Sequence, residues 1–197
     1  REQTRGRWQS KAERNLAHGL GEVRRLASAL ELSESIRDQA CQLFRSAQSE
    51  DLLRGRSIEA IGAASIYGTG RCNQHPLLLE DVVDAARVES TRVTNAYRTL
   101  NRELELPAPP MRPTSFVPRL ISELGLDHDI RRRANELAEH AEGTALTNGC
   151  QPSGVAAACV YLAAQEQGAL ITQSTVASAA EVSVVTLRSR RDELQAI

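Results

Sequence analysis

Aromatic residues make up only 3% of this 197-residue chain, and methionine occurs once. The core must therefore be built from Ala, Leu, Val and Ile, which suits closely packed helices better than β-sandwiches. Long apolar runs are also lacking, because the longest, Val155–Ala164, is about half of what a membrane span requires. The first residues contain no apolar signal segment. We therefore expect an all-α protein that has no membrane partner.

Lysine is almost absent, since Lys11 is the only one among 24 basic residues. Arginine makes planar, bidentate contacts with phosphate, carboxylate and guanine that lysine cannot make. The same bias also follows from a GC-rich genome or a salt-adapted organism. The net charge of −1 neither favours nor excludes a polyanionic partner.

Recognisable metal-binding spacing is absent. The four cysteines are Cys41, Cys72, Cys150 and Cys159, and the four histidines are His18, His75, His128 and His140. The cysteines form no C-x-x-C pair, and no histidine stands at ligand spacing from one. We expect small, buried thiols in a reducing compartment, and no metal or cofactor in this chain.

The most informative feature present is an internal repeat. Sliding the chain against itself by 94 residues aligns Val23–Leu100 with Val117–Leu194 without a gap. Roughly twenty of about eighty aligned positions are identical, and almost all of these are apolar. The chain is therefore predicted to contain two copies of one packing scheme.

Each copy is predicted to contain five helices. In the first copy we expect helices over about 12–30, 79–86 and 90–104, and two more that begin after Ser33 and after Ser57. In the second copy we expect helices over about 116–124, 173–180 and 184–196, and two more that begin after Asp127 and at Pro152. Ser33, Ser57 and Asp127 are good N-caps, and Pro152 suits a first turn. The third helix of each copy is apolar on nearly every face, which predicts that it is buried at the centre.

The predicted domain organisation follows from the repeat. Residues 1–11 are polar, lack periodicity and resemble the end of a linker in which Trp8 is the only anchor candidate. The first repeat spans 12–106 and the second spans 116–197. Between them, residues 107–115 form a proline-rich linker that cannot continue a helix.

The last segment has helix-turn-helix form. Small alanines up to Ala180 precede a tight turn that Val182 is expected to fill, and Ser183 is expected to cap the second helix. That helix should expose Val185 and Arg188 in its N-terminal half, where recognition helices meet base edges. A plain packing hairpin is the alternative.

Signatures of an enzyme are absent. Gly68-Thr69-Gly70 lacks the preceding strand and the Lys-Ser/Thr of a phosphate loop, and is predicted to end a helix instead. No nucleophile elbow is present, and the acidic pairs precede or open helices, where carboxylates favour the helix dipole. We therefore expect a protein that is not an enzyme.

Three segments resemble the archaeal branch of the transcription factor IIB family. They are Gly55-Arg-Ser-Ile-Glu-Ala-Ile-Gly-Ala-Ala-Ser-Ile-Tyr67, its copy ending at Tyr161, and Val185-Thr-Leu-Arg188. The resemblance covers essentially the whole chain. It implies two tandem cyclin-like five-helix repeats, the second ending in the helix-turn-helix, that bind the TATA-binding protein on promoter DNA and help recruit RNA polymerase. It also implies a cytoplasmic, nucleoid-associated monomer, and a zinc ribbon upstream of Arg1.

The resemblance assigns DNA contacts to particular residues. Val185 and Arg188 match the residues that read the B-recognition element upstream of the TATA box, and Thr186 and Arg190 lie on the same helix. Gly55 and Arg56 match a loop that touches DNA downstream of TATA.

Two departures from the family pattern leave contacts open. Cys150 stands where the second repeat's loop usually has arginine, and Glu89 begins a helix without the usual lysine cluster. A cyclin-type regulatory subunit of a kinase is the alternative function.

Overall fold

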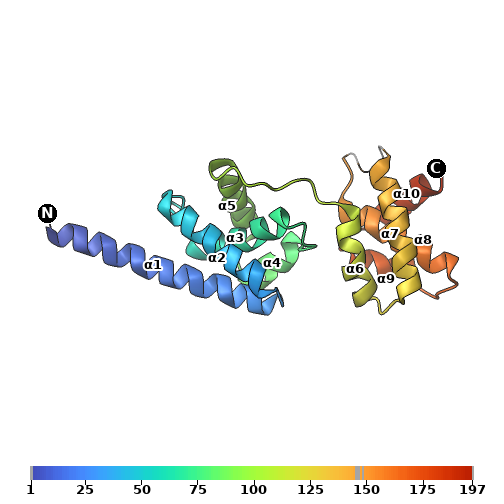
Figure 1. The fold of residues 1–197 in the computed structure, drawn as a ribbon, viewed down its shortest axis with the longest axis horizontal. Helices are drawn as coiled ribbons and strands as arrows, with labels where there is room; N and C mark the ends of the chain where they lie inside the picture. Colours follow the sequence, from blue (N-terminus) through green and yellow to red (C-terminus); the bar gives the residue numbers. More distant parts are fainter. Residues whose placement is uncertain (1, 145–146, 148, 197) are drawn as a thin grey trace. The chain divides into compact units, whose positions relative to one another are not determined.

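The computed structural model describes residues 2–144, 147 and 149–196, with side chains from residue 11 onward. The chain divides into two compact units, Arg1–Pro110 and Met111–Ile197, hereafter unit 1 and unit 2. Each unit contains five α-helices (Figure 1), and the described residues include no β-strand. The expectation of an all-α fold built from two five-helix repeats is therefore confirmed.

Unit 1 is organised around its third helix. Its helices are α1 (Glu2–Ala29), α2 (Glu34–Ser49), α3 (Ile58–Cys72), α4 (Leu79–Ala86) and α5 (Ser90–Glu103). Helix α3 packs against the other four. Val23, Phe44 and Ile61 are completely buried in the core that these helices enclose. The apolar composition of α3 predicted this central position.

Unit 2 repeats the arrangement. Its helices are α6 (Pro113–Glu123), α7 (His128–Gly143), α8 (Pro152–Glu166), α9 (Gln173–Ala179) and α10 (Val184–Gln195). Helix α8 packs against the other four, and every residue from Ser153 to Ala164 is buried. Small side chains let the surrounding helices approach α8 closely.

Side-chain caps fix the starts of several helices, as the sequence predicted. The side chains of Ser57 and Asp127 accept hydrogen bonds from the backbone N–H of Ala60 (3.1 Å) and Ile130 (2.9 Å). Ser33 accepts one from Ile36 at 3.4 Å. Each cap satisfies a backbone donor that the helix leaves unpaired, so the boundary is set locally.

Two helices begin earlier than predicted. Helix α1 begins at Glu2 instead of near Ala12, and α6 begins at Pro113 instead of Phe116. The start of α1 is polar but contains good helix formers and no proline, so it can be helical without an apolar stripe. The prediction for Trp8 concerns a side chain outside the described residues. Pro113 occupies the first turn of α6, where a missing N–H costs nothing.

The Gly68-Thr69-Gly70 segment lies within the last turns of α3 and is buried there. The helix continues two residues further, so these residues lie near the helix end rather than at it. A segment buried inside a helix cannot cradle a phosphate group.

The cysteines and His18 lie at positions that indicate a role in the fold. No disulfide joins the four cysteines, all of which the structure describes; Cys41 and Cys159 are buried as expected, whereas Cys72 and Cys150 are only half-buried, because they lie at a helix end and in a loop. Burial raises the pKa of the Cys159 thiol to about 12. His18 forms a 3.2 Å contact with Glu59, a pairing that the sequence did not indicate.

The described residues contain neither a membrane-spanning helix nor a cluster of metal ligands. No described helix is both long and apolar enough to cross a membrane. No group of three or more His, Cys, Asp and Glu side chains in that part of the chain could hold a metal ion.

Candidate nucleic-acid interface

The candidate recognition element of unit 2 consists of α9, a short turn and α10. Ser183 caps α10 by accepting a hydrogen bond from the Thr186 backbone N–H at 3.0 Å, as predicted. Leu187 anchors the helix because its side chain is completely buried. Val182 is half-buried in the turn, and it lies close to Gly154 at the start of α8. These contacts fix which face of α10 remains outside.

The outer face of α10 presents Val185 and Arg188. The Val185 side chain is 74% exposed, one of two large apolar side chains that are exposed among the described residues. Arg188 is exposed, and its Nε donates a 2.7 Å hydrogen bond to Oε1 of Gln173. Gln173 therefore orients the guanidinium of Arg188, and the two terminal nitrogens of Arg188 remain able to donate elsewhere. An apolar side chain and an oriented arginine on one helix face suit the edges of base pairs.

Gln173 is a candidate site residue that sequence reasoning missed. It is the first residue of α9 and lies 15 positions before Arg188. Its position in the sequence could have indicated this role, because the first helix of a helix-turn-helix begins beside the recognition helix. A polar residue there can act as a positioning residue for a base-reading arginine.

Thr186 and Arg190 are engaged inside unit 2. The Thr186 hydroxyl lies 2.8 Å from the Ser183 hydroxyl. Nη1 of Arg190 lies 2.7 Å from both Cys150 Sγ and Glu193 Oε2, and the Arg190 side chain is only 26% exposed. The structure thus places these two residues on the same helix as Val185 and Arg188, but with their polar groups already bound.

The candidate loop of unit 1 precedes α3. Gly55 has φ +75°, a left-handed conformation that glycine adopts without strain. Arg56 follows and donates from Nη1 to the carbonyls of Leu52 (3.1 Å) and Arg54 (3.3 Å). Its Nη2 donates to Thr99 Oγ1 on α5 at 3.1 Å. These three neutral acceptors hold the guanidinium in place and leave its charge uncompensated.

Two further arginines join Arg56 around a hollow at the start of α3. The hollow has a volume of about 510 Å³, and Arg54, Arg56 and Arg92 line it. Arg92 is partly neutralised by Glu89 at 3.5 Å. The N-terminus of α3 adds the positive end of a helix dipole. Sequence reasoning missed Arg54 and Arg92, although a second arginine in the loop before a helix was a usable signal.

One carboxylate in the first turn of α3 has a lowered pKa. A hydrogen bond from the backbone N–H of Glu59 lowers the pKa of its own side chain, and the contact with His18 lowers it further. Glu59 is not among the residues that line the hollow.

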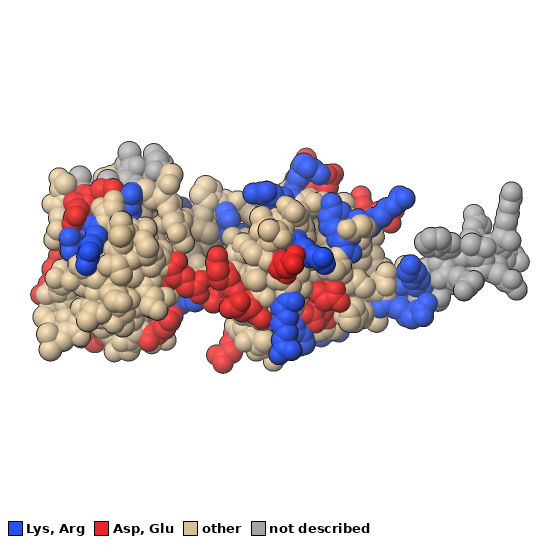
Figure 2. All heavy atoms as spheres, turned by 180° about the vertical axis from the view of Figure 1, so that it is seen from behind, with Lys and Arg blue, Asp and Glu red and all other residues tan. Residues whose placement is uncertain are grey.

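The two units differ in the charge of their surfaces. In Figure 2 the visible face of unit 1 carries basic and acidic side chains in alternation, whereas that of unit 2 is mostly uncharged. Residues 111–197 contain eight arginines and ten acids, a net charge of −2. Unit 2 thus lacks the basic face that an autonomous DNA-binding protein presents.

Comparison with known proteins identifies relatives over nearly the whole chain. The family model for the transcription factor TFIIB repeat matches residues 12–103 and 107–197. "Transcription initiation factor IIB 5" of Halobacterium salinarum is 56% identical over 197 residues, which are 100% of this chain and 64% of that protein. "Transcription initiation factor IIB 1" of Thermococcus kodakarensis is 40% identical over 95% of this chain and 65% of that protein.

The chain thus spans a little under two thirds of the length of these relatives. A chain in the structure of the CAK complex from Chaetomium thermophilum bound to ATP-gamma-S aligns with 94% of this chain and 63% of its own length. The identity is 13% and the TM-score 0.43, too low to support an argument. The relatives named above are transcription initiation factors and not enzymes, in agreement with the expectation from the residues. Two matched repeats that together cover almost every residue place this chain in the TFIIB family.

Proposed function

We propose that this chain is the promoter-binding core of a transcription initiation factor. It binds the complex of TATA-binding protein and promoter DNA, reads the upstream B-recognition element through α10, and helps recruit RNA polymerase at the nucleoid. The observation that carries the proposal is the pair Val185 and Arg188, exposed on the first turns of α10 in a chain of the TFIIB family.

The two exposed residues have separate roles in the proposal. Arg188, oriented by Gln173, donates from its terminal nitrogens to O6 and N7 of a guanine in the major groove. Val185 packs against a thymine methyl group or excludes a base that lacks one. For Thr186 and Arg190 we propose a supporting role at the edge of the DNA interface, where they hold the start and the middle of α10 in place, because Ser183 and Glu193 already bind their polar groups.

Unit 1 contributes through the loop before α3. Gly55 lets the backbone approach DNA closely, and Arg56 enters a minor groove or binds a phosphate downstream of the TATA box. The hollow lined by Arg54, Arg56 and Arg92 supports a role in anion binding. Because unit 2 has few positive charges of its own, its affinity depends on being held on DNA by the TATA-binding protein and unit 1.

A gel-shift titration with the TATA-binding protein tests base reading by Arg188. On a TATA promoter with its upstream element, Arg188→Ala should weaken binding by about 1–3 kcal/mol, because a bidentate base contact is lost. On DNA with the contacted base pair scrambled, the variant and the parent should bind alike. Arg132→Ala is the matched control, since it removes the same charge from an exposed arginine of α7. Equal losses on both DNAs would show that Arg188 binds phosphate or is structural.

The same assay without the TATA-binding protein tests the dependence on that partner. The full chain alone should show no preference for the upstream element at moderate salt, because its net charge is −1. Tight, sequence-selective binding by the chain alone would contradict the proposed mode of action.

A further inference from the structure

The loop between α2 and α3 has a second hollow on its other side. This hollow has a volume of about 430 Å³ and is lined by α1, α2 and the loop, whereas the hollow at the start of α3 is lined by the loop, α3 and α5. The two are called the α2 hollow and the α5 hollow below. Helix α3 packs closely against both α2 and α5, and α2 and α5 share at most slight contacts. The two hollows therefore flank the loop.

Arginines line both hollows. Arg45 of α2 and Arg54 of the loop line the α2 hollow, and Asp51 is the one acid among its lining residues. Arg54 also lines the α5 hollow together with Arg56 and Arg92, and the residues that the structure describes there include no acid. The lining of each hollow thus carries a net positive charge, which favours an anion on both sides of the loop.

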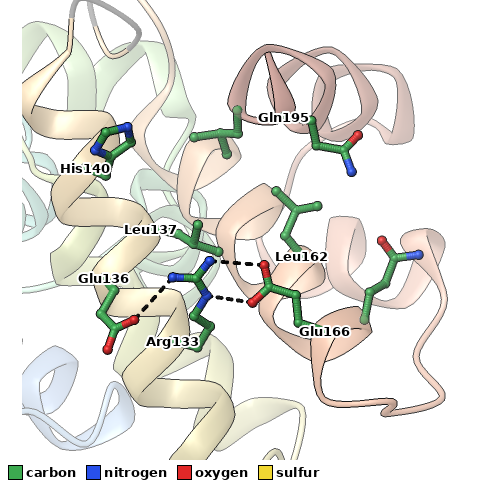
Figure 3. Close-up of a pocket in the computed structure, with 9 residues that line it drawn as sticks. Arg133, Glu136, Leu137, His140, Leu162, Glu166 and Gln195 are labelled. Atoms are coloured by element: carbon green, nitrogen blue, oxygen red, sulfur yellow. Dashed lines mark hydrogen bonds and ion pairs between the residues drawn. The ribbon is translucent and has the colours of Figure 1, made fainter. Parts of the chain in front are cut away.

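The two arginines of the α2 hollow have no partner within the described part of the chain. The side chains of Arg45 and Arg54 are exposed, and neither forms an ion pair or a hydrogen bond with a described residue. An arginine that lines a pocket of unit 2 is bound differently. Figure 3 shows Arg133 between Glu136 and Glu166, which it contacts at 3.2 Å and 2.6 Å. The charge of Arg133 is compensated within unit 2, whereas the charges of Arg45 and Arg54 remain able to attract a ligand.

The internal repeat shows that the fold forms without three of these arginines. Adding 94 to the residue numbers of Arg45, Arg54 and Arg92 leads to a glutamate, an asparagine and a threonine, at positions 139, 148 and 186. Unit 2 nevertheless contains the same five helices, with its third helix buried at the centre. The three arginines therefore belong to the surface chemistry of unit 1 rather than to the common packing scheme.

We infer that the two hollows bind phosphates of opposite DNA strands across one minor groove, with the loop 54–56 between them. The inference rests on the proposed function, which brings this loop to DNA downstream of the TATA box. A loop that approaches a minor groove has one sugar–phosphate strand on each side, because the groove is only about 6 Å wide. The α2 hollow receives one strand through Arg45, and the α5 hollow receives the other through Arg92.

The arrangement favours DNA over an acidic protein segment. A duplex presents phosphates on both walls of a groove, so two separate positive hollows with a loop between them match its geometry. A guanidinium can also donate two parallel hydrogen bonds to one phosphate. Unit 1 thereby supplies positive contacts that unit 2, with a net charge of −2, does not.

Gel-shift titrations over a range of potassium chloride concentrations test the α2 hollow, with the TATA-binding protein saturating. Arg45→Gln should reduce the slope of log K against log salt by about 1, since one phosphate contact is lost. Arg45→Lys should keep the slope, because lysine also binds phosphate. Arg24→Gln is the matched control. It removes the same charge from an exposed arginine of α1 that lines neither hollow, and it should leave the slope unchanged.

Neutral methylphosphonate linkages locate the two phosphates without any change to the protein. They are placed one at a time in either strand downstream of the TATA box. A linkage that weakens binding of the parent by about two- to fivefold, but does not weaken binding of Arg45→Gln, marks the phosphate at the α2 hollow. The same comparison with Arg92→Gln marks the phosphate at the α5 hollow. We expect the two marked phosphates to lie on opposite strands.

Several results would overturn the inference. They are an unchanged salt slope for Arg45→Gln, an equal change for Arg24→Gln, or two marked phosphates on the same strand. A loss of affinity for Arg45→Gln that no methylphosphonate removes would assign the α2 hollow to an acidic protein surface, and would also overturn it. In each case a parent complex that still reads the upstream element through Arg188 leaves the proposed function intact, so the two failures are distinguishable.

Discussion

Units 1 and 2 each place an arginine where the loop before the third helix meets the fifth helix, a position called the corner below. The two units supply this arginine from different elements. In unit 1, Arg56 in the loop before α3 reaches Thr99 on α5. In unit 2 the equivalent loop residue is Cys150, and the guanidinium comes from Arg190 on α10, which contacts Cys150 and Glu193. Arg190 stands at the position of Ala96, and Glu193 at that of Thr99.

The exchange changes the chemistry of the corner without changing its packing. Arg56 is held by neutral oxygens and keeps its charge available, whereas Arg190 is neutralised by a carboxylate at 2.7 Å. The corner in unit 1 therefore suits an anion, and that in unit 2 does not. The proposed base reading has the reverse division, because Thr91 and Thr94 occupy the unit 1 positions of Val185 and Arg188. Duplication preserved the core while the exposed residues diverged.

The largest expected difference between the copies is in stability at one duplicated leucine. Leu100→Ala should destabilise unit 1 by about 2–5 kcal/mol, because the side chain is completely buried. Leu194→Ala should cost about 1 kcal/mol, since its side chain is only partly buried. Denaturant unfolding of the full chain, followed with a probe in each unit, measures both. Equal costs would mean that the two leucines contribute alike despite their different burial.

A second stability difference arises at the first helix of each unit. Gly19 of α1 lies against Phe44, and an added Cβ would overlap the Phe44 ring. The unit 2 counterpart of Gly19 is Pro113, where α6 begins. Gly19→Ala should therefore destabilise unit 1 by about 1–3 kcal/mol, because the buried ring has to move.

Gly21→Ala is the control for Gly19→Ala. It lies on the same helix with nothing within 4 Å of an added Cβ, so it should be neutral or slightly stabilising. If both variants unfold at the same denaturant concentration, α1 and α2 are free to separate and the close contact is unimportant for stability.

These differences show which parts of the fold a sequence can reveal. The helix starts at Ser57 and Asp127 depend on a side chain three residues away, so the sequence contains the whole cause. The repeat fixed the common core, because buried positions such as Leu26 and Leu120 are the ones that duplication preserved. The extension of α1 back to Glu2 was missed, because the sequence of residues 2–11 has no apolar periodicity from which a helix could be predicted.

The candidate interface was only partly predictable. Exposure of Val185 and Arg188 followed from helical spacing around buried Leu187. The engagement of Arg190 did not, because its partner Cys150 is 40 positions away. Contacts between distant segments depend on how helices pack, and a single sequence does not encode them in any local pattern.

The contrast between the two corner arginines can be tested on DNA. Arg56→Ala should weaken the ternary complex by about 1 kcal/mol on every sequence and reduce the salt slope by about 1, since one phosphate contact is lost. Arg190→Ala should leave the salt slope unchanged, because Glu193 already neutralises the charge. Gel-shift titrations over a range of potassium chloride concentrations measure both slopes. An equal fall for both variants would remove the distinction between the corners.

The smallest expected difference is an acid dependence confined to unit 2. Hydrogen bonds from Arg133 lower the pKa of the Glu166 side chain, whereas the unit 1 counterparts are Gln39 and Cys72, which form no ion pair. A carboxyl group whose pKa is lower in the folded state contributes stability above its unfolded pKa of about 4.5, and loses it as the pH falls through the folded pKa. Because both side chains are partly exposed, the pair should contribute about 0.2–1 kcal/mol.

Glu166→Gln should therefore lower the stability of unit 2 at neutral pH by that amount and leave unit 1 unchanged. As the pH falls through the folded pKa of Glu166, the variant and the parent should converge, because the parent's carboxyl group becomes protonated. Denaturant unfolding at pH 7 and over a series of acidic pH values measures the difference, and 1 M salt at pH 7 should reduce it. A difference that stays constant over the whole acidic series would mean that Glu166 stabilises unit 2 by packing rather than by its charge.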